Sequence, residues 1–303
     1  MKVAALAGGT GSAKLLRGLA KLSVDLTAVV NVGDNAWMYG VYVCPDIDIA
    51  TYALAGVADR EKGWGIGGDT FSVVERLSQL GEEAWFRLGD LDLATCLVRT
   101  SMLRGGASLT EATDRIRRMY GVKPRVLPAT DSEVETRLVT SKGDLHLQEF
   151  WVRERGRPRV SKVRYEGARR ASATSQVRFA ILGADRVVVC PGNPVTSLGP
   201  MLAIPGFESL LARAAGRVVA LSPMAGEGPF SGPAGKLMGA MGLREDSVGV
   251  ARLYSKFLDA ILISDRDSKS AEIESLGVKC READTFMEGP DDEVRLAKEM
   301  LDL

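Results

Sequence analysis

A glycine-rich turn near the start of the chain constrains its fold more than any other feature. Lys2 to Ala7 is a short run rich in strand-forming residues, and Gly8-Gly9 closes it. Ser12 to Leu22 then has apolar residues at helical spacing, and Leu26 to Val32 has the composition of a buried strand. A strand, a glycine turn, a helix and another strand in succession predict a βαβ unit with parallel strands.

The same alternation returns in the second half of the chain. The pattern predicts strands over Arg186–Cys190, Arg217–Ser222 and Ala260–Ser264. It predicts helices around Leu109–Tyr120, Glu208–Ala215 and Asp292–Met300. These elements extend the parallel sheet that the first βαβ unit begins.

The middle of the chain has a different pattern. Val134–Thr140, Leu145–Val152 and Val160–Tyr165 read as strands joined by short polar turns, which is typical of an antiparallel sheet. We therefore expect one α/β domain over residues 1–303, Rossmann-like, with a mostly parallel sheet flanked by helices. A smaller antiparallel β/helical insertion is expected at about residues 130–175.

Charge and cysteine usage narrow the class of protein. The 303 residues carry 39 basic and 39 acidic side chains, so no overall charge attracts nucleic acid or an anionic membrane. We expect neither as a partner, since the chain also has no apolar run of 18 residues. Four widely spaced cysteines without a CxxC pair predict a reducing, cytoplasmic location. His146 is the single histidine, so mechanisms with a histidine base depend on it alone.

The turn itself, GGTGSAK, predicts an anion site. Glycines let the backbone approach a phosphate, and the free N–H groups at a helix start favour negative charge. Thr10 and Ser12 can cap or donate, and Lys14 adds a positive charge. The spacing matches neither the GxGxxG nor the GxxxxGK[ST] fingerprint. The plainer alternative is a tight turn with a serine cap.

Three aspartates follow the second predicted strand. Asn31 ends that strand, where open α/β sheets place their ligands. Asp34, Asp46 and Asp48 lie within fifteen residues, a density of carboxylates that suits Mg²⁺. Aspartates that only cap turns and helices are the alternative.

Two later turns carry small polar residues. CPGNPVTSLGP follows the predicted strand at Arg186 and contains Gly192, Asn193, Thr196 and Ser197, which can hold a base or a phosphate. SGPAGK, Ser231 to Lys236, is a further candidate phosphate turn. Both turns also have the composition of ordinary loops.

Together these motifs resemble the CofD family, the 2-phospho-L-lactate transferases of coenzyme F-420 biosynthesis. The similarity runs nearly end to end. It is carried by GGTGSAKLLRGL, VVNVGDNAWMYGVYVCPDIDIATYALAG, GWGIGGDT, RLGDLDLATCLVRT, GASLTEATD, LHLQEFWV, NPVTSLGPMLAIPG and SGPAGKLM.

The resemblance implies an activity. The family moves a phospholactyl or phosphoenolpyruvyl group from a guanosine diphosphate-linked donor to the deazaflavin Fo, releases GMP, depends on Mg²⁺ and forms homodimers. Position by position, Asp34 and Asp46 correspond to metal-binding carboxylates, and Asp48 to an acid near the Fo hydroxyl. The implied nucleotide-binding residues are Gly8, Gly9, Thr10, Gly11, Ser12, Lys14, Asn31, Gly192, Asn193, Thr196 and Ser197. Those implied for Fo are Asp48, Trp37 and Leu91.

Two positions depart from the family pattern. Asn35 replaces the second of two successive acids, which weakens any role of this position in metal binding. Leu91 replaces the arginine of a GDRD motif, and the loss of that arginine bears on the affinity for the acceptor. A CofD-like regulator that binds a nucleotide without turnover is the second hypothesis. A dehydrogenase is the third, but it needs a GxGxxG turn that the chain does not have.

Overall fold

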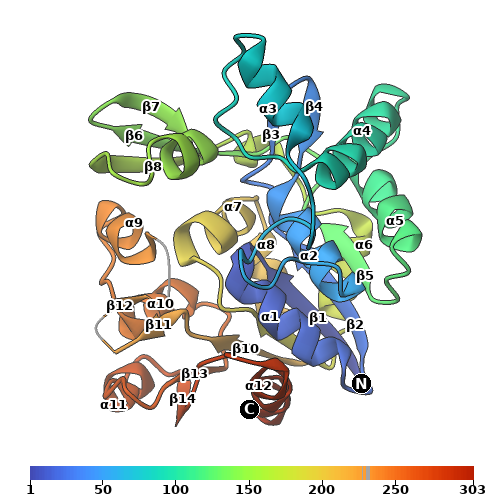
Figure 1. The fold of residues 1–303 in the computed structure, drawn as a ribbon. Coiled ribbons are helices and arrows are strands. Elements are labelled where there is room, and N and C mark those ends of the chain that lie inside the picture. Colours follow the sequence, from blue (N-terminus) through green and yellow to red (C-terminus); the bar gives the residue numbers. More distant parts are fainter. Residues whose placement is uncertain (227, 230–232) are drawn as a thin grey trace.

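The computed structural model describes residues 1–226, 228–229 and 233–303. A seven-stranded parallel sheet lies at its centre, in the order β14-β13-β10-β9-β1-β2-β5 (Figure 1). The strands are β1 (Lys2–Ala7), β2 (Asp25–Val30), β5 (Arg125–Pro128), β9 (Arg186–Val189), β10 (Arg217–Leu221), β13 (Ala260–Ser264) and β14 (Lys279–Ala283). The inner strands are almost continuously apolar because helices cover both of their faces.

Helices cover the two faces of this sheet. Helix α1 (Gly9–Ala20) packs against α2 (Pro45–Ala55) and α12 (Pro290–Asp302), while α6 (Ser175–Leu182) packs against α8 (Phe207–Ala212). Figure 1 shows α1 and α12 in front of the sheet and α8 behind it. The other α-helices are α3 (Ser72–Gln79), α4 (Asp90–Arg104), α5 (Leu109–Met119), α7 (Gly199–Leu202), α9 (Ala234–Ala240), α10 (Ser247–Tyr254) and α11 (Ser270–Glu274).

The direction of winding reverses between β1 and β9. From β1 the chain continues to β2 and β5 on one side, whereas β9, β10, β13 and β14 lie on the other. The loops after β1 and β9 therefore leave the sheet in opposite directions and open a crevice at their carboxyl ends. This arrangement confirms the predicted Rossmann-like α/β class.

A three-stranded antiparallel sheet lies apart from the parallel one, at the upper left of Figure 1. It contains β6 (Glu135–Thr140), β7 (Gly143–His146) and β8 (Val160–Glu166), in the order β7-β6-β8. The predicted antiparallel insertion is confirmed by these strands. The single-domain organisation stays a prediction.

One predicted strand, Leu145–Val152, is wrong in its second half. β7 ends at His146, and Glu149–Arg153 forms a π-helical turn, η1. The Glu149 carboxylate accepts the backbone N–H of His146, which turns the chain out of the sheet. Phe150 then enters the core while Trp151 stays exposed.

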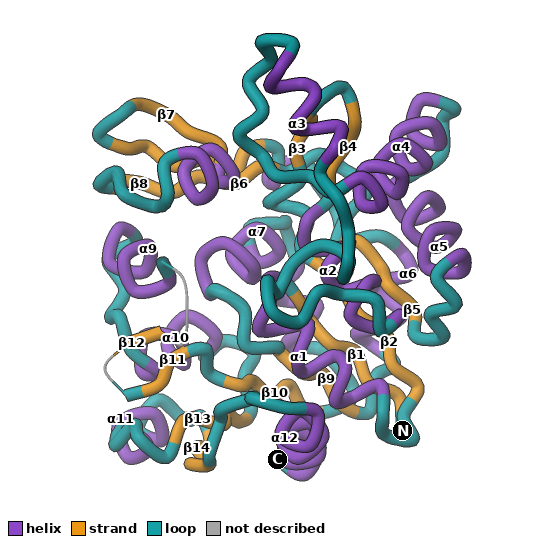
Figure 2. The backbone as a smooth tube through the Cα atoms, in the orientation of Figure 1, coloured by secondary structure: helices purple, strands orange, loops and turns teal. Residues whose placement is uncertain are grey.

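The remaining elements are short. Two hairpins pair β3 (Ala36–Met38) with β4 (Val41–Val43) and β11 (Met224–Ala225) with β12 (Gly228–Pro229). A 3₁₀ turn, η2 (Ala168–Arg170), and a π-helical turn, η3 (Pro194–Leu198), are the other short elements. Figure 2 distinguishes the helices and strands from the described loops between them. Among the described residues, no helix has the length and apolar character needed to cross a bilayer.

Candidate functional site

A cavity of about 820 Å³ opens where the winding of the sheet reverses. Its walls come from the loops after β1, β2, β9, β10 and β14, from α2 and η1, and from the segments around Trp64 and Arg87. Of the residues predicted for the site, eleven line the cavity: Gly9, Thr10, Gly11, Lys14, Asp34, Asp46, Asp48, Gly192, Asn193, Thr196 and Ser197. The fold thus brings together three motifs that lie far apart in the sequence, between Gly9 and Ser197.

The glycines of the first turn allow two loops to touch. A Cβ built on Gly8 would lie 2.6 Å from Ser197 Cβ, and one on Gly192 would lie 2.5 Å from the Gly8 carbonyl oxygen. Both contacts are too close for any other residue. Gly9 has a φ of +74°, a conformation that favours glycine. These glycines therefore serve the packing of the β1 and β9 loops as well as the approach to a ligand.

Two of the polar side chains predicted to bind the ligand make their hydrogen bonds inside the protein. The Ser12 hydroxyl donates to the Gly8 carbonyl and accepts from the Gly8 N–H, so it closes the turn. The Asn193 side chain accepts from the N–H groups of Val195 and Thr196 and caps η3. Lys14, in contrast, lies at the cavity wall, where its ammonium donates to the Met287 carbonyl at 2.8 Å.

Asn31 joins two carboxylates at the end of β2. Its amide nitrogen donates to Asp34 Oδ1 at 3.0 Å and to Asp46 Oδ2 at 2.9 Å. The second Asp46 oxygen accepts the Gly9 N–H at 2.8 Å, which ties α2 to the first turn of α1. Asn31 itself lies just behind the cavity wall.

Burial raises the pKa of both carboxylates in this pair. Burial is the main cause of the raised pKa of both aspartates, and the charge of Asp46 adds to it for Asp34. No side-chain cation in the described part of the chain bonds to either carboxylate. Two such carboxylates facing a cavity suit a divalent cation with oxygen ligands, which would relieve their repulsion.

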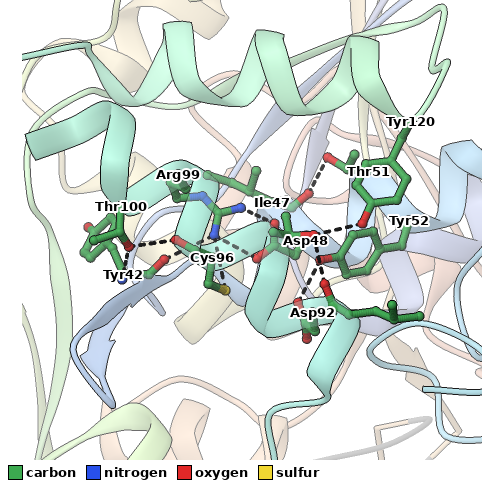
Figure 3. Close-up of polar contacts among 12 residues, drawn as sticks. Tyr42, Ile47, Asp48, Thr51, Tyr52, Asp92, Cys96, Arg99, Thr100 and Tyr120 are labelled. Atoms are coloured by element: carbon green, nitrogen blue, oxygen red, sulfur yellow. Dashed lines mark hydrogen bonds and ion pairs between the residues drawn. The ribbon is translucent and has the colours of Figure 1, made fainter. Parts of the chain in front are cut away.

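Asp48 has a different environment, shown in Figure 3. Both of its oxygens accept hydrogen bonds from the guanidinium of Arg99, one of them at 3.0 Å. Asp48 is 3% exposed and Arg99 is fully buried. Burial raises the pKa of Asp48, and the adjacent guanidinium opposes that rise. Asp48 reaches the cavity as one half of a buried ion pair.

A second carboxylate, Asp92, lies beside this ion pair on the first turn of α4. The Tyr52 hydroxyl donates to Asp92 Oδ1 at 2.7 Å. A carboxylate oxygen of Asp48, one of Asp92 and the Cys96 sulfur lie within 4.8 Å of one another. Burial, followed by the charge of Asp48, raises the pKa of Asp92 to about 7.

Aromatic and basic side chains form another part of the cavity wall. Trp64 and Phe71 pack edge to face with ring centroids 6.3 Å apart. The Arg87 guanidinium lies 4.3 Å from the centre of the Phe71 ring, and Lys62 lies over both rings. Apart from Phe71, these residues line the cavity and give this part of its wall a surface suited to a flat, polar ring.

Five predicted residues stand away from the cavity surface. Gly8, Ser12 and Asn31 support the wall from behind, while Trp37 and Leu91 are 50% and 53% exposed and do not line it. In the SGPAGK turn, residues 231–232 lie outside the described residues. Lys236 of that turn donates to the carbonyls of Gly156 and Arg157.

The sequence reasoning gave no role to Tyr52, Asp92 or Arg99. A signal was present, because Asp92, Cys96 and Arg99 lie at i, i+4 and i+7 on one face of α4. Asp48 and Tyr52 lie at i and i+4 on α2. In the structure these two helical faces are joined by the bonds from Arg99 to Asp48 and from Tyr52 to Asp92.

Comparison with known proteins agrees with this geometry. A family model described as 2-phospho-L-lactate transferase CofD matches residues 3–292. A protein named 2-phospho-L-lactate transferase from Methanosarcina acetivorans is 42% identical over 97% of this chain and 96% of its own. A protein named phosphoenolpyruvate transferase from Streptomyces griseus is 38% identical over 100% of this chain and 98% of its own.

The fold also matches a solved structure. A crystal structure of a UPF0052 family protein from Bacillus halodurans superposes with a TM-score of 0.66, covering 99% of each chain at 20% identity. That likeness concerns the fold alone. The family model and the two relatives cover nearly the whole chain, and the chain belongs to the CofD family.

Proposed function

We propose that this protein transfers a phospholactyl or phosphoenolpyruvyl group from a guanosine diphosphate-linked donor to a hydroxyl of the deazaflavin Fo, and that GMP is released. The observation that carries this proposal is the Asp34–Asp46 pair beside the first turn of α1, at the reversal point of the sheet. Phosphoryl transfer needs such a combination of an anion site and metal-binding carboxylates. The names of the relatives supply the chemical class of the transferred group.

Different parts of the cavity wall suit the two substrates. The turn after β1 and the loop after β9 offer backbone groups and Lys14 to the phosphates of the donor. The segments around Trp64 and Arg87 offer an aromatic and a basic side chain to the ring of the acceptor. Asp48 lines the same cavity, and its carboxylate can orient the acceptor hydroxyl. Catalysis then depends mainly on positioning and on neutralising charge.

Asp34 and Asp46 would hold Mg²⁺, with Asn31 fixing both carboxylates in place. Bound there, the ion would neutralise charge on the phosphate oxygens of the donor. The attacking oxygen of Fo forms a bond to the phosphorus that carries the acid, and the bond from that phosphorus to GMP breaks. A homodimeric state and a cytoplasmic location stay predictions.

The test is turnover by the purified protein with Fo, Mg²⁺ and each candidate donor. The proposal predicts stoichiometric GMP and a deazaflavin product that has gained the phospho-acid. A folded protein that binds guanosine diphosphate but forms no product with any donor would contradict it. That result would favour a CofD-like regulator instead.

A further inference from the structure

We infer that Asp92 is a further catalytic residue, which accepts the proton of the acceptor hydroxyl as the new phosphorus–oxygen bond forms. This inference rests on the proposed transferase function. It assigns to Asp48 the orientation of the hydroxyl and to Asp92 the removal of its proton. Three features of the cluster in Figure 3 carry it: the hydrogen bonds of Asp48, those of Asp92, and the distance between them.

Asp48 is poorly suited to accept a proton. Both of its oxygens accept from the fully buried Arg99 guanidinium. A proton on either oxygen would displace one of these charge-assisted hydrogen bonds and leave the guanidinium buried without its full counter-charge. The other acceptors near the guanidinium, the Tyr42 carbonyl at 3.2 Å and the Cys96 sulfur at 3.7 Å, cannot replace the charge of Asp48, since the carbonyl is neutral and burial raises the pKa of the Cys96 thiol.

Asp92, unlike Asp48, has a carboxylate oxygen that is free to accept a proton within the described structure. Its Oδ1 accepts from the Tyr52 hydroxyl at 2.7 Å, while within the described structure no hydrogen bond to Oδ2 is found. Asp92 lines the cavity beside Tyr52 and Asp48. It occupies the third position of α4 but makes no capping bond to Gly89, the residue before the helix. The side chain is therefore directed at Tyr52 and the cavity rather than used to cap its own helix.

The distance between the two carboxylates suits a shared hydroxyl. An oxygen of Asp48 and an oxygen of Asp92 lie within 4.8 Å of each other, so one hydroxyl oxygen can reach both. The proton passes to Asp92, the oxygen electron pair forms the bond to phosphorus, and the electron pair of the broken bond leaves with GMP. No oxidant or further reactant is needed.

The charges around Asp92 favour a base near neutral pH. Burial and the charge of Asp48 raise its pKa to about 7, with a smaller contribution from Asp69, while Tyr52 and Arg99 lower it. A general base works best when its pKa lies near the working pH. A metal ion in the same cluster is disfavoured, because the Arg99 guanidinium lies 3.7 Å from the Cys96 sulfur.

The test combines a rate with a pH profile, measured with Fo, Mg²⁺ and the donor that the wild type uses. The wild-type kcat/KM should fall as pH drops below about 7, as Asp92 takes up a proton. Asp92→Asn keeps the shape and the bond from Tyr52. It should lower kcat by about 10²- to 10⁴-fold, leave both KM values within a few-fold, and abolish this acidic limb.

A second pair of variants separates the base role from a structural one. Tyr52→Phe removes the hydrogen bond that lowers the pKa of Asp92, so its acidic limb should move to higher pH. Tyr120→Phe is the matched control: its ring packs on Tyr52, but its hydroxyl bonds to Thr95 and should not move the limb.

The outcomes are distinguishable. If the wild type forms product while Asp92→Asn keeps its rate and its acidic limb, this inference is overturned and the transferase stands. An unmoved limb in Tyr52→Phe would count equally against it. If the folded wild type forms no product with any donor, the proposed function fails and this inference fails with it.

Discussion

At the scale of single residues, the cavity holds carboxylates whose charges are compensated in different ways. Asp48 has a guanidinium on both oxygens, whereas Asp34 and Asp46 share one neutral amide. The charge of Asp48 is therefore neutralised within the protein. The charges of Asp34 and Asp46 remain for a ligand to neutralise.

The buried ion pair leads to a prediction about stability. Arg99→Met removes the cation and leaves Asp48 buried and unpaired, so the free energy of unfolding should fall by about 3–5 kcal/mol in urea denaturation. The control is Lys256→Met, which breaks an exposed ion pair with Glu208 and should cost less than about 1 kcal/mol. If the two substitutions lower the free energy of unfolding equally, the buried Arg99–Asp48 pair stabilises the protein no more than an exposed ion pair does.

The Asp34–Asp46 pair leads to a prediction about metal binding. Mg²⁺ should raise the melting temperature of the wild type, because a ligand at 100 times its Kd stabilises the native state by about 2.7 kcal/mol. Asp46→Asn should abolish this rise, whereas Asp114→Asn, at a surface ion pair on α5, should keep it. An undiminished rise in Asp46→Asn would place the metal elsewhere.

The sequence revealed these residues unequally. The density of Asp34, Asp46 and Asp48 after a buried strand was enough to select them. The helical spacing of Asp92, Cys96 and Arg99 marks a polar face on α4, but the partner of Arg99 was not predictable, because Asp48 lies 51 residues away on another helix. A local pattern identifies the face of one helix and not the distant segment that it meets.

At the scale of elements, the loops after β1 and β9 act as one unit. Gly192→Ala should push these loops apart, because the new Cβ would lie 2.5 Å from the Gly8 carbonyl oxygen. We expect at least a tenfold loss in affinity for a guanine nucleotide, measured by calorimetry, since each 1.4 kcal/mol of lost binding energy is tenfold.

The control for that substitution is Gly289→Ala. Gly289 has an extended backbone, and a Cβ there meets no atom within 4 Å. Its replacement should leave nucleotide affinity within about twofold and cost at most about 1 kcal/mol of stability. If Gly192→Ala also keeps its affinity, the close approach of the two loops does not shape the site.

Elements were predictable where local patterns were strong. Lys2–Ala7 and Ala260–Ser264 are strands over the predicted residues, because inner parallel strands are continuous apolar runs. The edge strands β5 and β14 went unpredicted. β5 has four residues and ends in proline, and β14 is KCREA, whose polar residues face solvent at the sheet edge.

At the scale of the whole molecule, the site depends on topology. The cavity is assembled from segments between Gly9 and Glu288, and only the reversal of winding between β1 and β9 brings them together. The sequence predicted the first βαβ unit and placed candidate residues at strand ends, where open α/β sheets bind ligands, but it did not predict the reversal. The contribution of the segments around Trp64 and Arg87 to the cavity wall follows from tertiary packing and not from any local pattern.

The most direct measurement of the central claim is the mass of the deazaflavin after incubation with Fo, Mg²⁺ and each guanosine diphosphate-linked donor, with wild type and Asp46→Asn in parallel. The account predicts that the wild type adds a phospholactyl or phosphoenolpyruvyl group and releases an equal amount of GMP. It predicts at least a hundredfold slower product formation by folded Asp46→Asn, a loss of about 2.7 kcal/mol of transition-state stabilisation. Unchanged Fo with every donor, or equal rates for the two proteins, would contradict it.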